Sequence, residues 1–167
     1  SSSNSSPVFK PPAAKPVYPD SAKWVNTHPS FLHGEANTMS ALACRPGRSS
    51  SLIVIPARLH STRLPQKLLL RQTGKTVIQH TYEAACRAAL PAGVVVSTDA
   101  QEMLAEVVSF GGEAQMTSRH LQSGTDRVAE VAARRPDIEI FVNVQGDEPE
   151  LSGEAIDRCI SMLLDDP

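Results

Sequence analysis

Short apolar runs alternate with amphipathic stretches along the last two thirds of the chain. The runs at 52–55 and 94–96 are uninterrupted and aliphatic, which is typical of strands buried on both faces. The segments at 113–116 and 138–144 are also expected to be extended. The pattern therefore predicts four strands, separated by stretches long enough for helices.

Apolar side chains spaced three and four residues apart predict a helix after each of these strands. Asp99, followed by Glu102, is expected to be a helix N-cap rather than a ligand. Thr76 with Gln79 has the form of a capping box, and the pairing of Ser123 with Asp126 is expected to cap the helix that follows. The expected helix starts all carry a side chain that can accept a hydrogen bond from the first turn: Thr76, Asp99, Ser123 and Ser152.

Strand and helix alternate about four times with short connections, which predicts right-handed parallel crossovers. The expected fold class is α/β, with a doubly wound, mostly parallel sheet. A chain of 167 residues is long enough for one such domain and short for two. We expect that domain over 51–167.

The first fifty residues differ in composition from the rest. They hold seven of the thirteen prolines and show no sustained apolar periodicity, so 1–50 is expected to be a disordered or loosely packed extension. It carries five Lys/Arg against two Asp/Glu, a net +3, whereas 51–167 carries eleven against sixteen, a net −5. Because nucleic-acid binders usually present a basic face, no nucleic-acid partner is expected.

Three cysteines, far apart in the sequence, indicate a reducing compartment. No apolar run approaches the ~18 residues of a membrane-spanning helix, and the start of the chain lacks the layout of a secretory signal. We therefore expect a cytoplasmic protein that does not bind a membrane.

Three cations follow the first expected strand: Arg58, Arg63 and Lys67. Ligands of open parallel sheets bind beyond the carboxyl ends of the strands. A curved loop at this place can direct these side chains toward successive phosphates, where they offset the charge that develops when a phosphoanhydride breaks. The alternative interpretation is a solvated basic loop. The loop matches neither a Walker sequence nor a GxGxxG turn.

Two further loops are expected at the same edge. Gln122, Ser123 and Gly124 precede a helix, whose first amides can hold an anion or the edge of a base, although ordinary helix capping is the alternative. Asp147 follows the strand at 138–144 and could ligate Mg²⁺, which prefers one or two carboxylates together with phosphate oxygens and water. Its alternative is a plain Gly-Asp turn. Together the loops predict a nucleotide site with a metal.

Four motifs, in their order and spacing, resemble those of the 3-deoxy-manno-octulosonate cytidylyltransferases, also called CMP-KDO synthetases. They are IPARLHSTRLPQK at 55–67, TDA at 98–100, HLQSGTDR at 120–127 and NVQGDEP at 143–149. The related sialic-acid enzymes usually continue after IPAR with a glycine-bearing sequence of the GGSK type. The sequence LHSTRLPQK is similar to the octulosonate branch instead.

The resemblance implies a Rossmann-like nucleotide-diphospho-sugar transferase fold and a cytoplasmic enzyme with Mg²⁺ as cofactor. The implied reaction transfers CMP from CTP to 3-deoxy-manno-octulosonate (KDO), releases pyrophosphate and serves lipopolysaccharide biosynthesis. The anomeric hydroxyl of the sugar acid would attack the α-phosphate directly, so catalysis would consist of alignment and charge stabilisation.

The resemblance also implies a role for each matching residue. Arg58, Arg63 and Lys67 would form the catalytic phosphate clamp. Asp147 would hold Mg²⁺, and Gln145 and Arg127 would reach the sugar side. The residues implied to lie by the nucleotide, including its cytosine and ribose, are Pro56, Ala57, Arg58, Lys67, Gln122, Ser123 and Gly124.

One departure from the family concerns length. The sequence stops at Pro167, whereas family members continue for roughly another third of a domain. The part expected to be missing supplies much of the sugar pocket, a second metal carboxylate and the contact of an expected homodimer. Two alternatives therefore stay open: a truncated, non-catalytic nucleotide-binding module, and a cytidylyltransferase for another sugar acid.

Overall fold

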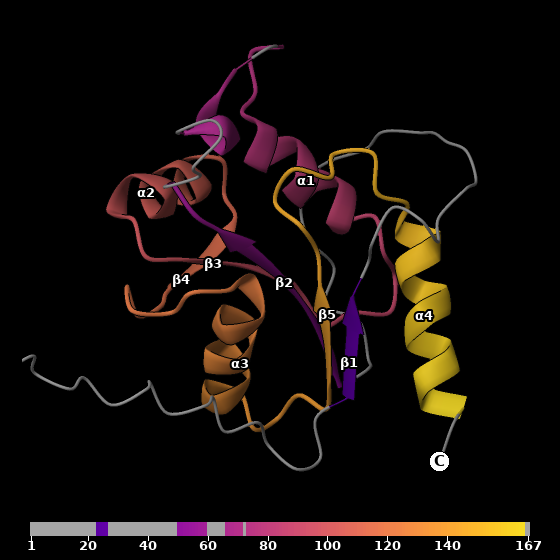
Figure 1. Ribbon diagram of the computed structural model, residues 1–167. Helices are drawn as coiled ribbons and strands as arrows, with labels where there is room; N and C mark the ends of the chain where they lie inside the picture. Colours follow the sequence, from indigo (N-terminus) through magenta and orange to yellow (C-terminus); the bar gives the residue numbers. More distant parts are fainter. Residues whose placement is uncertain (1–22, 27–49, 60–65, 72, 166–167) are drawn as a thin grey trace, which may run out of the picture.

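The computed structural model describes residues 23–26, 50–59, 66–71 and 73–165, and these form a layered α/β unit (Figure 1). Its central sheet has five parallel strands in the order β1-β5-β2-β3-β4. The strands are β1 (Lys23–Asn26), β2 (Ser51–Ala57), β3 (Val94–Thr98), β4 (Glu113–Met116) and β5 (Ile140–Asn143). The expected parallel sheet is thereby confirmed.

Helices cover both faces of this sheet, as expected for a doubly wound fold. They are α1 (Val77–Ala85), α2 (Gln101–Ser109), α3 (Gly124–Arg134) and α4 (Gly153–Asp165), together with one turn of 3₁₀ helix at Lys67–Leu69. Buried side chains of α1, α2 and α4 share one apolar cluster, whereas those of α3 belong to the cluster on the opposite face. In the part of the chain that the structure covers, no helix combines the length and the apolar character needed to cross a membrane.

Strand β2 lies in the middle of the sheet and is buried on both faces. Ile53 and Ile55 point into the larger cluster, and Leu52 and Val54 point toward α3. Because successive side chains of a strand alternate between faces, an uninterrupted aliphatic run is what this position requires. Burying each such side chain contributes roughly 1.5–3 kcal/mol.

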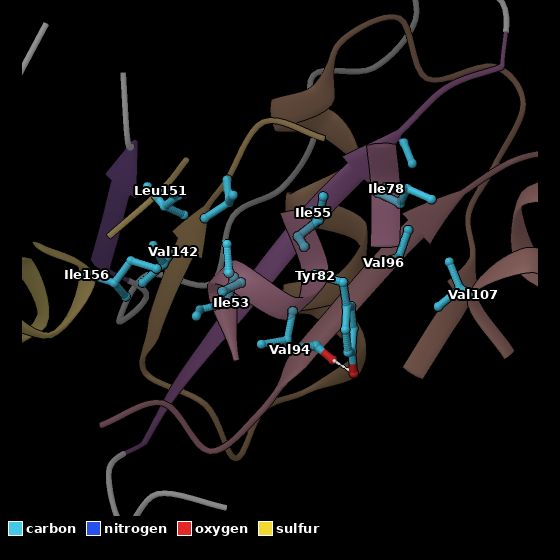
Figure 2. Packing of buried hydrophobic residues seen from close by; sticks show 14 of the residues in the cluster. Ile53, Ile55, Ile78, Tyr82, Val94, Val96, Val107, Val142, Leu151 and Ile156 are labelled. Carbon is cyan, nitrogen blue, oxygen red and sulfur yellow. Dashed lines mark hydrogen bonds between the residues drawn. The ribbon is translucent and has the colours of Figure 1, made fainter. Parts of the chain in front are cut away.

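The larger cluster also contains a buried tyrosine whose hydroxyl is satisfied. Figure 2 shows Tyr82 of α1 among the aliphatic side chains, with its hydroxyl donating to the carbonyl oxygen of Val94 at 3.2 Å. The Tyr82 hydroxyl oxygen in turn accepts from the amide of Glu113 at 3.1 Å. Tyr82 thus connects α1 to the two strands β3 and β4 at the edge of the sheet.

Strand β1 belongs to the stretch that was expected to be a loose extension. It pairs in parallel with β5 from Lys23 opposite Ile140 to Asn26 opposite Asn143. Its four residues, KWVN, are too few to show a periodicity, and their pairing with β5 depends on a segment far away in the sequence. Most of 1–50 lies outside the described residues, so the prediction for it stays a prediction.

The expected helix caps form at two of the helices. Thr76 accepts from the amide of Gln79 at 3.4 Å, and Ser123 and Asp126 form a complete capping box. The prediction that Asp99 caps α2 was wrong, because Ala100 is the N-cap and makes no side-chain cap bond. The Asp99 carboxylate instead accepts from the Arg127 guanidinium at 2.7 Å. A charge-assisted bond to a buried cation is stronger than a bond to a neutral amide.

Candidate functional site

The loops predicted to carry chemistry leave the sheet at one edge. Strand β2 ends opposite β3, with Ala57 beside Thr98, and β3 in turn ends beside Met116 of β4. Strand β5 runs on the other side of β2 in the same direction. The segments that follow these four strands therefore emerge together, which is where ligands of open parallel sheets bind.

Two glycines let neighbouring loops approach the end of β2 closely. A Cβ on Gly124, at the start of α3, would lie 3.1 Å from Cγ of Pro56. A Cβ on Gly146 would lie 3.0 Å from the Leu68 side chain and 3.5 Å from the Pro56 carbonyl oxygen. The Thr81 hydroxyl also donates to the carbonyl oxygen of Gly146 at 2.8 Å. Pro56 thus lies between two closely packed loops, and larger residues would push those loops apart.

Arg58 connects the loop after β2 to the loop before α3. Its Nη2 donates to the carbonyl oxygen of Leu121, next to Gln122. Its Nε is buried and has no hydrogen-bond partner in the part of the chain that the structure covers. A buried donor without an acceptor is unfavourable, and a ligand oxygen at this place would satisfy it.

Lys67 and Asp147 lie side by side although eighty residues separate them. The Lys67 Nζ is 2.6 Å from Oδ2 of Asp147, and the two side chains are 47% and 44% exposed. A predicted phosphate-binding cation therefore neighbours the predicted metal carboxylate. Arg63, the third predicted cation, lies outside the described residues.

By itself the Asp147 carboxylate can hold a divalent ion only weakly, and tight binding of Mg²⁺ would need further ligands from a substrate. Over 23–26, 50–59, 66–71 and 73–165, no group of three or more His, Cys, Asp or Glu side chains is placed to hold a metal ion. Mg²⁺ is often held by one or two carboxylates while phosphates and water complete its octahedron. The half-exposed Asp147 carboxylate suits that mode, and a metal binding there would compete with Lys67 for the same oxygen.

The start of α3 presents amides to the same edge. Ser123 and Asp126 accept each other's backbone amides at 3.0 and 3.1 Å. An α-helix leaves its first amides without intrahelical partners. Within the described residues, this capping box therefore leaves the amides of Gly124 and Thr125 for a ligand. Gln122, just before the cap, is exposed. The loop can therefore offer both backbone donors and a side-chain amide.

Of the two residues predicted on the sugar side, only Gln145 is exposed, two positions before Asp147. Arg127 is 1% exposed and donates to Thr117 at 2.6 Å and to Asp99 at 2.7 Å. This burial conflicts with a direct sugar contact. The helical spacing already held the signal, because position 127 shares a face with the buried Val128 and Val131. Thr117 lies between β4 and α3 and had no such signal.

Comparison with known proteins agrees with this arrangement. The cytidylyltransferase family profile matches residues 52–167. The chain is 54% identical over 116 residues to a 3-deoxy-manno-octulosonate cytidylyltransferase of Rhodopirellula baltica, covering 70% of this chain and 46% of that protein. A protein of the same name from Geotalea daltonii is 50% identical over 113 residues, covering 68% of this chain and 44% of that one.

A solved structure is similar as well. The structure of CMP:2-keto-3-deoxy-manno-octonic acid synthetase complexed with CTP matches with a TM-score of 0.65 and 43% identity, and covers 71% of this chain and 49% of that one. The chain thus spans about half the length of the relatives it matches. The match of the family profile over 52–167 shows that the chain belongs to the cytidylyltransferase family.

Proposed function

We propose that the protein containing this chain transfers CMP from CTP to KDO, releasing pyrophosphate, in the synthesis of lipopolysaccharide. The observation that carries the proposal is the convergence of three loops around Pro56, each of which brings a different part of a nucleotide site. The relatives named 3-deoxy-manno-octulosonate cytidylyltransferase support the choice of sugar acid. The CTP-complexed synthetase supports the choice of nucleotide.

In this proposal the nucleotide lies over the end of β2. Pro56, which is partly exposed, forms the floor of the site, and Ala57 beside it is fully buried in the apolar cluster. The amides at the start of α3, with Gln122 and Ser123, face the cytosine and ribose, because helix N-termini bind polar and anionic groups through unpaired amides. Arg58 lies between base and phosphates, and its buried Nε donates to a nucleotide oxygen.

The phosphates lie toward Lys67, with Arg63 assigned to the same clamp by sequence. Asp147 would hold Mg²⁺, which when bound supplies positive charge to neutralise the phosphate oxygens. Gln145, exposed on the loop after β5, is the residue left to contact the sugar acid. The cytoplasmic location and the homodimeric state expected from the resemblance are part of this proposal.

The reaction needs no covalent intermediate. The anomeric hydroxyl of KDO loses its proton to water and its oxygen forms a bond to the α-phosphorus. The bond from that phosphorus to the bridging oxygen breaks, so that pyrophosphate leaves. Negative charge grows on the leaving oxygen, and Arg58 and Lys67 offset it from fixed positions. Fixing both reactants in line supplies the remaining catalysis.

The test is pyrophosphate release by the full-length protein in the presence of CTP, KDO and Mg²⁺. Asp147→Asn should lower kcat on the order of 10²-fold, the effect typical of losing one charge-stabilising group. Glu150→Ala is the matched control, because this exposed carboxylate lies three residues away on the same segment and should leave the rate unchanged.

Each outcome decides between the candidates. CTP binding without pyrophosphate release would replace the proposal by a non-catalytic nucleotide-binding module. Release that is faster with a different sugar acid would identify the alternative cytidylyltransferase. An Asp147→Asn rate equal to that of the wild type would refute the role given to Asp147.

A further inference from the structure

We propose that Arg127 and Asp99 form a positioning pair, which holds the loop at 117–123 in the shape that receives the nucleotide. The inference rests on the proposed function. It gives a role to a buried cation that the reaction itself does not touch.

Arg127 is the largest of the fully buried side chains in the described part of the chain, at 1% exposure. A buried charge is costly unless it is paired and hydrogen-bonded. Here the pairing comes from Asp99, at 2.7 Å and 18% exposed. A chain that needed only apolar packing at this place could use a leucine or methionine. The guanidinium therefore serves contacts that an apolar side chain cannot make.

Those contacts join both ends of one loop. Arg127 Nη1 donates to the Thr117 hydroxyl at 2.6 Å and to the Ser118 carbonyl oxygen at 3.4 Å, where the loop begins. Arg127 itself lies on α3, four residues after Ser123, where the loop ends. The Ser118 amide also donates to Glu130 of α3 at 2.9 Å. Start and end of the loop are thus tied to the same helix.

The hydrogen bonds that hold the loop extend to strand β3 of the sheet. Thr117 donates from both its amide and its hydroxyl to the carbonyl oxygen of Thr98, at 2.7 and 3.1 Å. Asp99 is the next residue after Thr98, so Arg127 closes a ring of contacts from β3 through the loop to α3. The middle of the loop contains Leu121, whose carbonyl oxygen accepts from Arg58, and Gln122 beside it. The position of Gln122 relative to Pro56 therefore depends on this ring.

Losing the anchor should affect the nucleotide more than the sugar acid. A displacement of about 1 Å in a positioned group can lower catalysis by 10²-fold. Thr117→Val keeps the shape of the side chain and removes its hydroxyl, and Asp99→Asn keeps the acceptor and removes the charge. Each should raise the KM for CTP about tenfold, leave the KM for KDO unchanged, and weaken the preference for CTP over UTP.

Two control variants separate positioning from general loss of stability. Thr117→Ser restores the hydroxyl and should restore CTP affinity. Ile138→Val truncates a buried side chain in the same apolar cluster as α3 without touching the ring. It should lower the melting temperature with no change in the KM for CTP.

Hydrogen exchange on the nucleotide-free protein tests the anchor without any catalysis. The amides of 118–123 should exchange about tenfold faster in Thr117→Val and Asp99→Asn, while the amides of β2 and β3 keep their protection. The positioning role would be overturned if the amides of 118–123 exchanged at the wild-type rate in both variants. It would also be overturned if Ile138→Val raised the KM for CTP as much as Thr117→Val and Asp99→Asn do. If the wild type neither binds nor uses CTP, the proposed function fails, and the exchange result still decides whether the pair holds the loop.

Discussion

Gly153 begins α4 where the backbone of that helix touches the end of α1. A Cβ at this position would lie 2.6 Å from the carbonyl carbon of Arg87 and 2.7 Å from the amide nitrogen of Ala88. Both are backbone atoms, which cannot rotate away as the end of a side chain can. Gly153→Ala should therefore push α4 away from α1 and destabilise the fold.

Two opposing effects determine the size of this loss. Alanine is the better helix former by up to about 1 kcal/mol, whereas overpacking costs about 1–3 kcal/mol. A shifted α4 also weakens the bonds that the Asp157 carboxylate accepts from the amides of Ala89 and Leu90, both at 2.8 Å. Hydrogen bonds to a charged group contribute about 1.5–3 kcal/mol each. The clash therefore outweighs helix propensity, and we expect a net loss of about 1–3 kcal/mol.

Urea unfolding followed by circular dichroism measures this loss. Gly93→Ala is the matched control, because the nearest atom to its Cβ is Leu52 Cδ1 at an ordinary 3.8 Å, and its stability should stay within about 0.5 kcal/mol of the wild type. In a double-mutant cycle, Asp157→Asn should cost less in the Gly153→Ala background, since the shifted helix has already weakened those bonds. A Gly153→Ala protein at least as stable as the wild type would refute the reasoning.

Two other substitutions test the site and the capping. Lys67→Met removes the cation that competes with a metal for Asp147. Because a half-exposed ion pair contributes about 0–1 kcal/mol, Mn²⁺ should bind the nucleotide-free protein up to about fivefold tighter. Electron paramagnetic resonance of unbound Mn²⁺ measures this, with Lys75→Met as control, and weaker binding in Lys67→Met would contradict the competition. Thr76→Ala removes the cap of α1 and should cost about 0.5–2 kcal/mol in urea unfolding. The exposed Thr125→Ala should cost less than about 0.5 kcal/mol, and equal losses would count against the cap.

The parts of the fold that sequence predicted correctly are those in which local pattern and burial agree. Strand β2 is a continuous aliphatic run because both of its faces are covered, and Ser123 with Asp126 is a capping signal complete within four residues. Asp99 carried a similar local signal, yet its carboxylate accepts from Arg127, which lies 28 residues away. Local preference fails where a distant charge offers a stronger bond.

The candidate site was predictable in its location and only partly in its contacts. Parallel strands end on the same side of the sheet. The residues that follow successive strands therefore have to share one edge, and here they are cations, a glycine turn and a carboxylate. The sequence could not show that Lys67 pairs with Asp147 or that Gly146 packs on Leu68. These pairs depend on how far each loop bends after it leaves its strand.

The sequence by itself determined the alternation of strands and helices and the residue types at the edge of the sheet, since both follow from burial and spacing along the chain. Only the tertiary structure decided that β1 extends the sheet beside β5, and that Arg127 pairs with Asp99 and Thr117. The physical reason is competition. A polar group takes the strongest partner within reach, and which partners are within reach is settled only when the strands and helices have packed.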